Sequence, residues 1–101
     1  MSPMRAKSSF ATFRANQALL QDLHGRLSTD SDTNAHGITF THSLGVVDVF
    51  QKGSIIARWT CAQQLLHLRF RGDRQSARKC GTIDDAVAFM REVLADVDND
   101  A

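Results

Sequence analysis

The stretch from residue 38 to residue 71 constrains the fold most, because strand-like runs follow one another there with only short breaks between them. Four runs are rich in β-branched, aromatic or alternating apolar residues, as strands prefer: residues 38–41, 46–50, 54–60 and 65–71. Leu44-Gly45 and Lys52-Gly53 supply turn signals between the runs. This pattern predicts an antiparallel sheet of four strands, and residues 76–80 suggest a fifth, weaker strand at an edge.

A helix is expected before the sheet. Apolar residues recur at helical spacing on one face: Phe10, Phe13, Leu20, Leu23 and Leu27. Ser9 marks the expected start of this helix, and its end is expected between Gly25 and Ser28. Residues 28–37 are small or turn-forming apart from one histidine, so they are expected to form a loop.

A second helix is expected after the sheet. Thr82 and Asp85 form a variant of the capping box, with aspartate in place of the usual glutamate. Asp84 and Asp85 also lie at the positive end of the expected helix dipole. A continuous apolar stripe follows: Ala86, Phe89, Met90, Val93 and Val97. The cap and the stripe together make this helix the most clearly marked element of the sequence.

The length of 101 residues fits one domain, and 43% hydrophobic residues are enough for a core without metal or disulfide support. We therefore predict an α+β domain over residues 9–97, with both helices packed on one face of the sheet. Residues 1–8 are expected to form a flexible N-terminal tail, and residues 98–101 a flexible acidic tail.

The strands carry apolar residues on both faces of the expected sheet. In one register the helices cover Val47, Val49, Ile55, Ala57 and Trp59, which needs an odd-length loop around Lys52-Gly53. A two-residue loop instead groups Phe50, Ile55 and Trp59 and buries Asp48. The first register is favoured because it keeps Asp48 and Arg58 out of the core. In this register the face of the sheet away from the helices carries a candidate protein-interaction surface: Val46, Phe50, Ile56 and Leu65.

The net charge of +1 hides an uneven distribution. Between positions 52 and 79 the sequence has seven basic residues and a single acidic residue, Asp73. After position 83 it has six acidic residues and a single basic residue, Arg91. A basic strand and hairpin beside Phe50 suit a phosphate-bearing ligand. The alternative is a solvated face with a charge-protected edge strand. The candidate anion or nucleic-acid contacts are Arg58, Arg69, Arg71, Arg74, Arg78 and Lys79.

Motifs for metal binding or catalysis are weak. Cys61, His67 and Cys80 fit no zinc-binding spacing, and the two cysteines are expected to be reduced thiols. The best catalytic pair available is Cys80 with His67, across the fourth and fifth strands. Residues 30–34 resemble the start of a calcium-binding loop but lack the glycine and glutamate that follow in such loops. We therefore expect no metal, no cofactor and no enzymatic activity.

The first ten residues contain no apolar run like that of a secretory signal, and no stretch approaches the ~20 apolar residues of a membrane span. Together with the reduced cysteines, this predicts a cytoplasmic protein without a small-molecule substrate. The leading hypothesis is a non-catalytic protein-interaction module that docks through its sheet face or edge onto a partner or a second copy. A nucleic-acid-binding module using residues 52–79 is the alternative, and a cysteine-dependent enzyme is a third.

Overall fold

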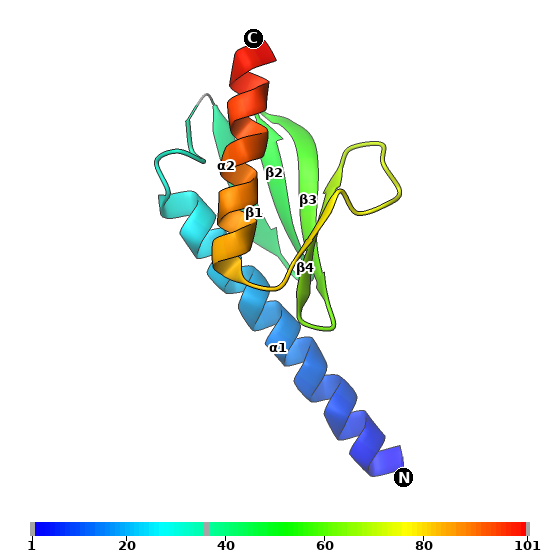
Figure 1. Ribbon diagram of the computed structural model, residues 1–101. Helices are drawn as coiled ribbons and strands as arrows, with labels where there is room; N and C mark the ends of the chain where they lie inside the picture. The colour runs from blue at the N-terminus through cyan, green and yellow to red at the C-terminus, as the bar shows by residue number, and fades with distance from the viewer. Residues whose placement is uncertain (1, 36, 101) are drawn as a thin grey trace.

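Two helices and a five-stranded sheet make up the fold of the computed structural model, which describes residues 2–35 and 37–100 and the side chains of residues 11–35 and 37–96 (Figure 1). The elements are α1 (Ser2–Thr29), β1 (Ile38–Ser43), β2 (Val46–Gln51), β3 (Ser54–Ala62), β4 (Leu65–Phe70), β5 (Arg78–Cys80) and α2 (Ile83–Asp100). The strands are antiparallel and lie in the order β1-β2-β3-β4-β5. The predicted α+β fold is confirmed, including the fifth strand.

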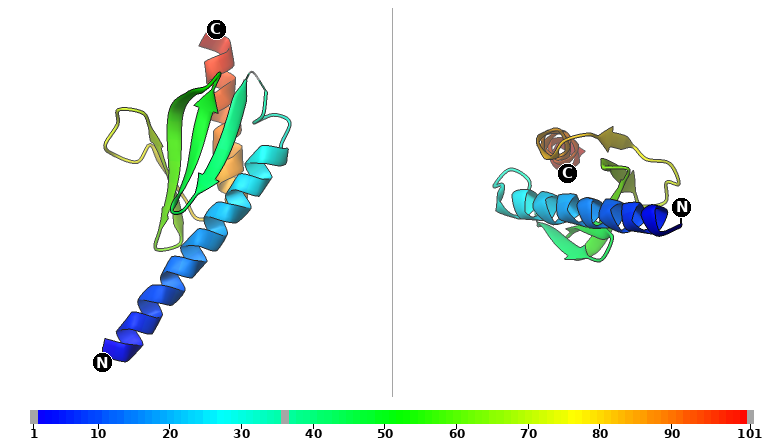
Figure 2. Two further views of the ribbon diagram at one scale, coloured as in Figure 1. Left: turned by 180° about the vertical axis from the view of Figure 1, so that it is seen from behind. Right: turned by 90° about the horizontal axis from the view of Figure 1, so that it is seen from below.

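The hydrophobic core lies between the helices and one face of the sheet (Figure 2). Alternate residues of the strands point toward the helices, as the pleat of a half-covered sheet requires. Trp59 is the largest side chain that is fully buried there. The same core contains Leu20, Leu23 and Leu27 of α1, Val47, Val49 and Leu68 of the sheet, and Ala86, Val87 and Met90 of α2.

The β2–β3 hairpin differs from the favoured register. Lys52 and Gly53 form a two-residue loop with φ values of 51° and 85°, and Gln51 pairs with Ser54 across it. The expected odd-length loop is therefore wrong. Two residues with positive φ match the right-handed twist of the flanking strands, which is why this short loop suits a hairpin.

A β-bulge in β3 explains why the short loop does not bury Asp48. Val49 pairs with Ala57 and Phe50 pairs with Ile55, so Ile56 is the extra residue. Because of this extra residue, Ala57 and Trp59 face the core while Arg58 between them faces outward with Asp48. Ile56, expected on the face away from the helices, consequently packs against the core, and that part of the candidate interaction surface is corrected.

α1 is longer than expected at its N-terminal end. It begins at Ser2 rather than at Ser9 and continues through Gly25 to Thr29. Figures 1 and 2 show its N-terminal half running past the ends of the strands, and the molecule measures 55 × 27 × 23 Å. Phe13, expected in the core, is 47% exposed because the sheet does not reach that turn of the helix. The structure does not describe the side chains of residues 1–10 and 97–101. The predicted core position of Phe10 and the predicted flexible tails at residues 1–8 and 98–101 therefore lie outside the part of the chain whose side chains are described.

The turn after α1 folds back over the end of the helix. The buried Thr33 hydroxyl donates to the carbonyl oxygen of Leu27 at 2.7 Å, and the side-chain amide of Asn34 donates to the carbonyl oxygen of Asp30 at 2.8 Å. The carboxylate of Asp30 accepts hydrogen bonds from the guanidinium of Arg91 in α2. The segment that resembles a calcium-binding loop thus forms a helix cap and an ion pair.

Candidate functional site

The open face of the sheet, opposite the helices, is the first candidate surface (Figure 2, left). Cross-strand pairs place Thr41, Asp48, Arg58 and Arg69 in one row across four strands. The neighbouring row contains Thr60, His67 and Lys79. Polar and charged side chains therefore dominate the middle of this face.

Two arginines lie directly opposite each other in this row. Arg58 of β3 pairs with Arg69 of β4, and both side chains are exposed. Arg58 Nε lies 2.6 Å from Asp48 Oδ1, and this hydrogen bond raises the pKa of the Arg58 guanidinium. Among the described residues Arg69 has no ionic partner. Like charges at opposed positions of an antiparallel pair destabilise a sheet, so this pairing is locally unfavourable.

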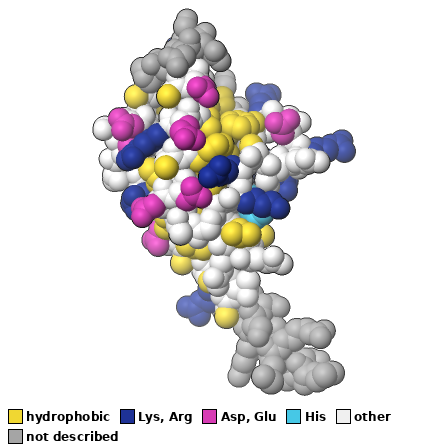
Figure 3. Space-filling model, in the orientation of Figure 1, with side chains coloured by type: hydrophobic (Ala, Val, Ile, Leu, Met, Phe, Trp, Pro, Cys, Tyr) yellow, Lys and Arg dark blue, Asp and Glu magenta, His cyan; other side chains and the backbone are white. Residues whose placement is uncertain are grey.

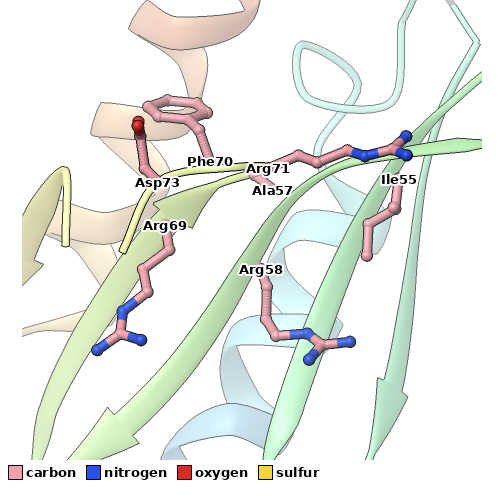
Figure 4. Close-up of a pocket in the computed structure, with 7 residues that line it drawn as sticks. All are labelled: Ile55, Ala57, Arg58, Arg69, Phe70, Arg71 and Asp73. Atoms are coloured by element: carbon pink, nitrogen blue, oxygen red, sulfur yellow. The ribbon is translucent and has the colours of Figure 1, made fainter. Parts of the chain in front are cut away.

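A hollow of about 250 Å³ lies beside these arginines (Figure 4). Its lining includes Arg58, Arg69 and Arg71 together with Ile55. Figure 4 shows Arg58 and Arg69 pointing the same way, whereas Arg71 reaches over β3 toward Ile55 and Asp73 points away from the guanidinium groups of Arg58 and Arg69. The Arg71 amide donates to the Ile56 carbonyl at 2.9 Å, which continues the pairing past β4. The bulge and this bond together position the third arginine.

The remaining candidate anion contacts separate into three places. Lys79 pairs with His67 and shares the open face, and Arg74 lies in the exposed loop between β4 and β5. Arg78 pairs with Leu68 and so lies at the edge of the opposite face, where its guanidinium contacts Asp85 at 3.4 Å and covers the ring of Phe89 at 5.2 Å. Arg78 is therefore separated from the other predicted contacts.

The candidate apolar surface is also divided. Val46 and Phe50 are half-buried on the open face, but Asp48 stands between them on the same strand. Leu65 is 37% exposed at the β3–β4 turn, while Ile56 packs against the core. The four residues do not form one continuous patch, because the bulge and the Asp48–Arg58 ion pair divide them.

Three exposed apolar residues lie toward one end of the sheet, which we call the apolar end and define by Phe13, Leu44 and Leu65. These are the exposed large hydrophobic residues within the described chain, and Leu44 reaches 79% exposure. Leu44 lies in the β1–β2 turn and Leu65 follows the β3–β4 turn, which is at the same end of a meander. Phe13 lies one helical turn before Asn16 and Gln17, the residues of α1 that contact those two turns.

The predicted catalytic pair is not brought together. Cys80 is fully buried and pairs with Leu66 on the helix-covered face. His67 points to the open face, where Nδ1 lies 3.2 Å from the hydroxyl of Ser76. Burial raises the pKa of the Cys61 and Cys80 thiols. The two partners thus occupy adjacent strands but opposite faces.

Metal-ligand residues are likewise dispersed. The Cys61 thiol donates to Asn16 Oδ1 at 3.3 Å, on the face away from His67. Within the side chains that the structure describes, three or more of His, Cys, Asp and Glu nowhere form a group able to hold a metal ion. His36 lies outside the described residues.

No family model, curated protein or solved structure matches this chain, so the assignment of function depends on its own residues. Over the described residues, neither helix combines the length and the apolar character required to cross a membrane.

Proposed function

We propose that this chain is a non-catalytic protein-interaction module that assembles with a second copy of itself through the apolar end. The observation that supports this most directly is that the exposed residues Phe13, Leu44 and Leu65 lie toward the end of the sheet that α1 runs past. Single exposed hydrophobic residues are ordinary, but a group of them at one end of a small domain is typical of an interaction site.

The projecting half of α1 favours a second copy as the partner. Residues 11–14 of α1 are all exposed, and a helical segment with little tertiary packing is only marginally stable in water, so this part of the helix gains from a surface to pack on. Each copy carries both a projecting helix and an apolar end. A two-fold arrangement lays the helix of each copy on the apolar end of the other, and a self-complementary surface of this kind is what a symmetric dimer needs.

The sheet face and the sheet edges, the routes expected from the sequence, are less suited to docking. β5 is only three residues long and carries Lys79, and a short basic edge strand discourages pairing. β1 is tied to α1, since Nε2 of His24 lies 3.2 Å from the carbonyl oxygen of Phe40. On the open face the Asp48–Arg58 ion pair separates the apolar residues. The proposed interface therefore moves to the end of the sheet.

Light scattering over a wide concentration range tests the proposal. The wild-type chain is expected to have the mass of a dimer, and Leu44→Asp that of a monomer. Leu44 is almost fully exposed, so this change leaves the folded monomer intact. Ala88→Asp is the matched control, because it adds the same charge at an exposed position of α2. A wild-type chain that stays monomeric throughout, or equal effects of the two variants, contradicts the proposal.

A further inference from the structure

We propose that the open face also binds the phosphate backbone of a single-stranded nucleic acid, with Arg58, Arg69 and Arg71 as the central contacts. This activity is independent of the apolar end. The opposed pair of Arg58 and Arg69 carries the argument, because it places two cations side by side with one carboxylate, Asp48, to offset them. A phosphate group accepts paired hydrogen bonds from guanidinium groups and relieves the repulsion between them.

The face keeps this positive charge because the acidic residues of the last helix lie on the other side. Asp84 pairs with Arg26 at 2.8 Å, and Asp85 lies 3.4 Å from Arg78. Figure 3, which views the helix side, shows acidic and basic side chains interleaved there. On the open face, by contrast, Arg69 and Arg71 have no ionic partner among the described side chains.

The spacing of the cations favours an extended ligand over a single phosphate ion. Outward positions of β4 succeed each other at about 6.7 Å, so the band from His67 to Arg71 is about 13 Å long. Lys79 lies opposite His67 at one end of this band. Figure 4 shows that Arg71 does not point in the same direction as Arg58 and Arg69. A chain of phosphates contacts all of these positions, whereas one phosphate reaches only some of them.

Apolar neighbours of the arginines favour a nucleic acid over a phosphorylated peptide. Phe50 and Ile55 are paired on adjacent strands, and Ile55 lines the same hollow as Arg58 and Arg71. Unpaired bases stack on aromatic and apolar side chains that lie beside a cationic track. Bases inside a duplex are already stacked on each other and are not free to stack on these side chains. The arrangement therefore fits a single strand best.

Fluorescence polarisation with a labelled oligothymidylate tests the proposal. Arg58, Arg69, Arg71 and Lys79 would make four phosphate contacts. Raising the salt concentration from about 50 mM to about 200 mM is then expected to weaken binding about 50-fold, which is a slope of about −2.8 for the logarithm of the binding constant against the logarithm of the salt concentration. The double variant Arg69→Gln/Arg71→Gln is expected to bind more weakly and to halve that slope. Phe50→Leu is expected to lower the affinity about tenfold with an unchanged slope, because it removes stacking and no charge.

The matched control is Arg26→Gln/Arg91→Gln, which removes the same charge from arginines that are ion-paired on the helix side. It is expected to bind as the wild type does. Equal weakening by the two double variants overturns the proposal, because the attraction is then a matter of net charge. A duplex of equal length or a phosphorylated peptide that binds as tightly also overturns it. Leu44→Asp is expected to bind the oligonucleotide normally, which separates this proposal from that of self-assembly.

Discussion

The side-chain oxygen of Asn16 accepts a hydrogen bond from the backbone amide of Gln64, 3.0 Å away in the turn between β3 and β4. The next residue of α1 makes a similar bond at the other turn, since Gln17 Oε1 accepts from the amide of Gly45 at 3.1 Å. Two adjacent polar residues of α1 thus hold both hairpin turns at this end of the sheet. They also fix the position of the helix relative to the apolar end.

Removing either side chain is expected to destabilise the fold. Asn16→Ala and Gln17→Ala each leave one turn amide without its partner, which costs about 1 kcal/mol of unfolding free energy. Because the two bonds serve different turns, the losses are expected to add in the double variant. Urea unfolding followed by circular dichroism measures them. Gln21→Ala, at an exposed site of α1, is the control, and an equal loss there removes the special role of the two residues.

The β3–β4 turn itself is expected to be open to improvement. Gln63 and Gln64 have φ values of 53° and 61°, which side chains other than Asn and Gly seldom adopt. Gln63→Asn/Gln64→Gly fits the same turn with less strain and is expected to raise the unfolding free energy by about 1 kcal/mol. The amide that bonds to Asn16 is kept. Gly53→Ala, at φ 85°, is expected to act in the opposite direction, and stabilisation by that change contradicts this account.

Most of the fold was predictable because it follows from local patterns. The turn residues and the alternation in the strands predicted the sheet, and the capping box predicted α2. The bulge was not predicted, since it depends on how β2 and β3 pair rather than on either strand alone. Its sequence signal is the adjacent pair Ile55-Ile56, two large apolar residues in succession within an otherwise alternating strand.

The candidate site was predictable only in part, because strand periodicity does not fix which face a residue joins near an irregularity. Arg58, Arg69 and Arg71 were predicted as anion contacts and do line one hollow. Arg78 was predicted with them, but its short strand places it beside Asp85 and Phe89. Asn16 and Gln17 were missed. Their signal is a pair of polar residues one turn before Leu20, on the core-facing side of the helix.

The thiols are expected to react slowly in the folded protein. Burial raises the pKa of Cys61 and of Cys80, so little thiolate is present at neutral pH, and Cys80 is fully enclosed. Labelling with a thiol reagent is expected to modify Cys61 before Cys80, and both at full speed in urea. If Cys80 reacts as fast as a free thiol in the native protein, the buried placement is contradicted and the cysteine-dependent enzyme regains support.

Acid is expected to weaken the link between α1 and α2. The hydrogen bond from Arg91 holds the pKa of Asp30 below its ordinary value. A group with a lowered folded-state pKa contributes stability above its unfolded pKa of about 3.9, and this is lost as the pH falls through the folded value. Wild type is therefore expected to exceed Asp30→Asn in stability at neutral pH, with a difference that shrinks below about pH 4. Arg91→Gln is expected to remove the same pH dependence, and an unchanged profile in that variant contradicts the assignment.

Trp59 is expected to tolerate replacement by phenylalanine better than its burial suggests. The indole is fully enclosed, and within the described residues Nε1 has no hydrogen-bond partner. An unpaired buried donor costs about 1–3 kcal/mol, so Trp59→Phe removes a penalty while it leaves a small cavity. The two effects oppose each other, and the net change in unfolding free energy is expected to stay within about 1 kcal/mol. Trp59→Ala removes the same donor but leaves a far larger cavity, and it is expected to lose about 3–5 kcal/mol. Urea titrations followed by far-ultraviolet circular dichroism measure both variants without relying on the indole signal. A loss in Trp59→Phe close to that of Trp59→Ala shows that the indole nitrogen is paired in the folded protein and contradicts this prediction.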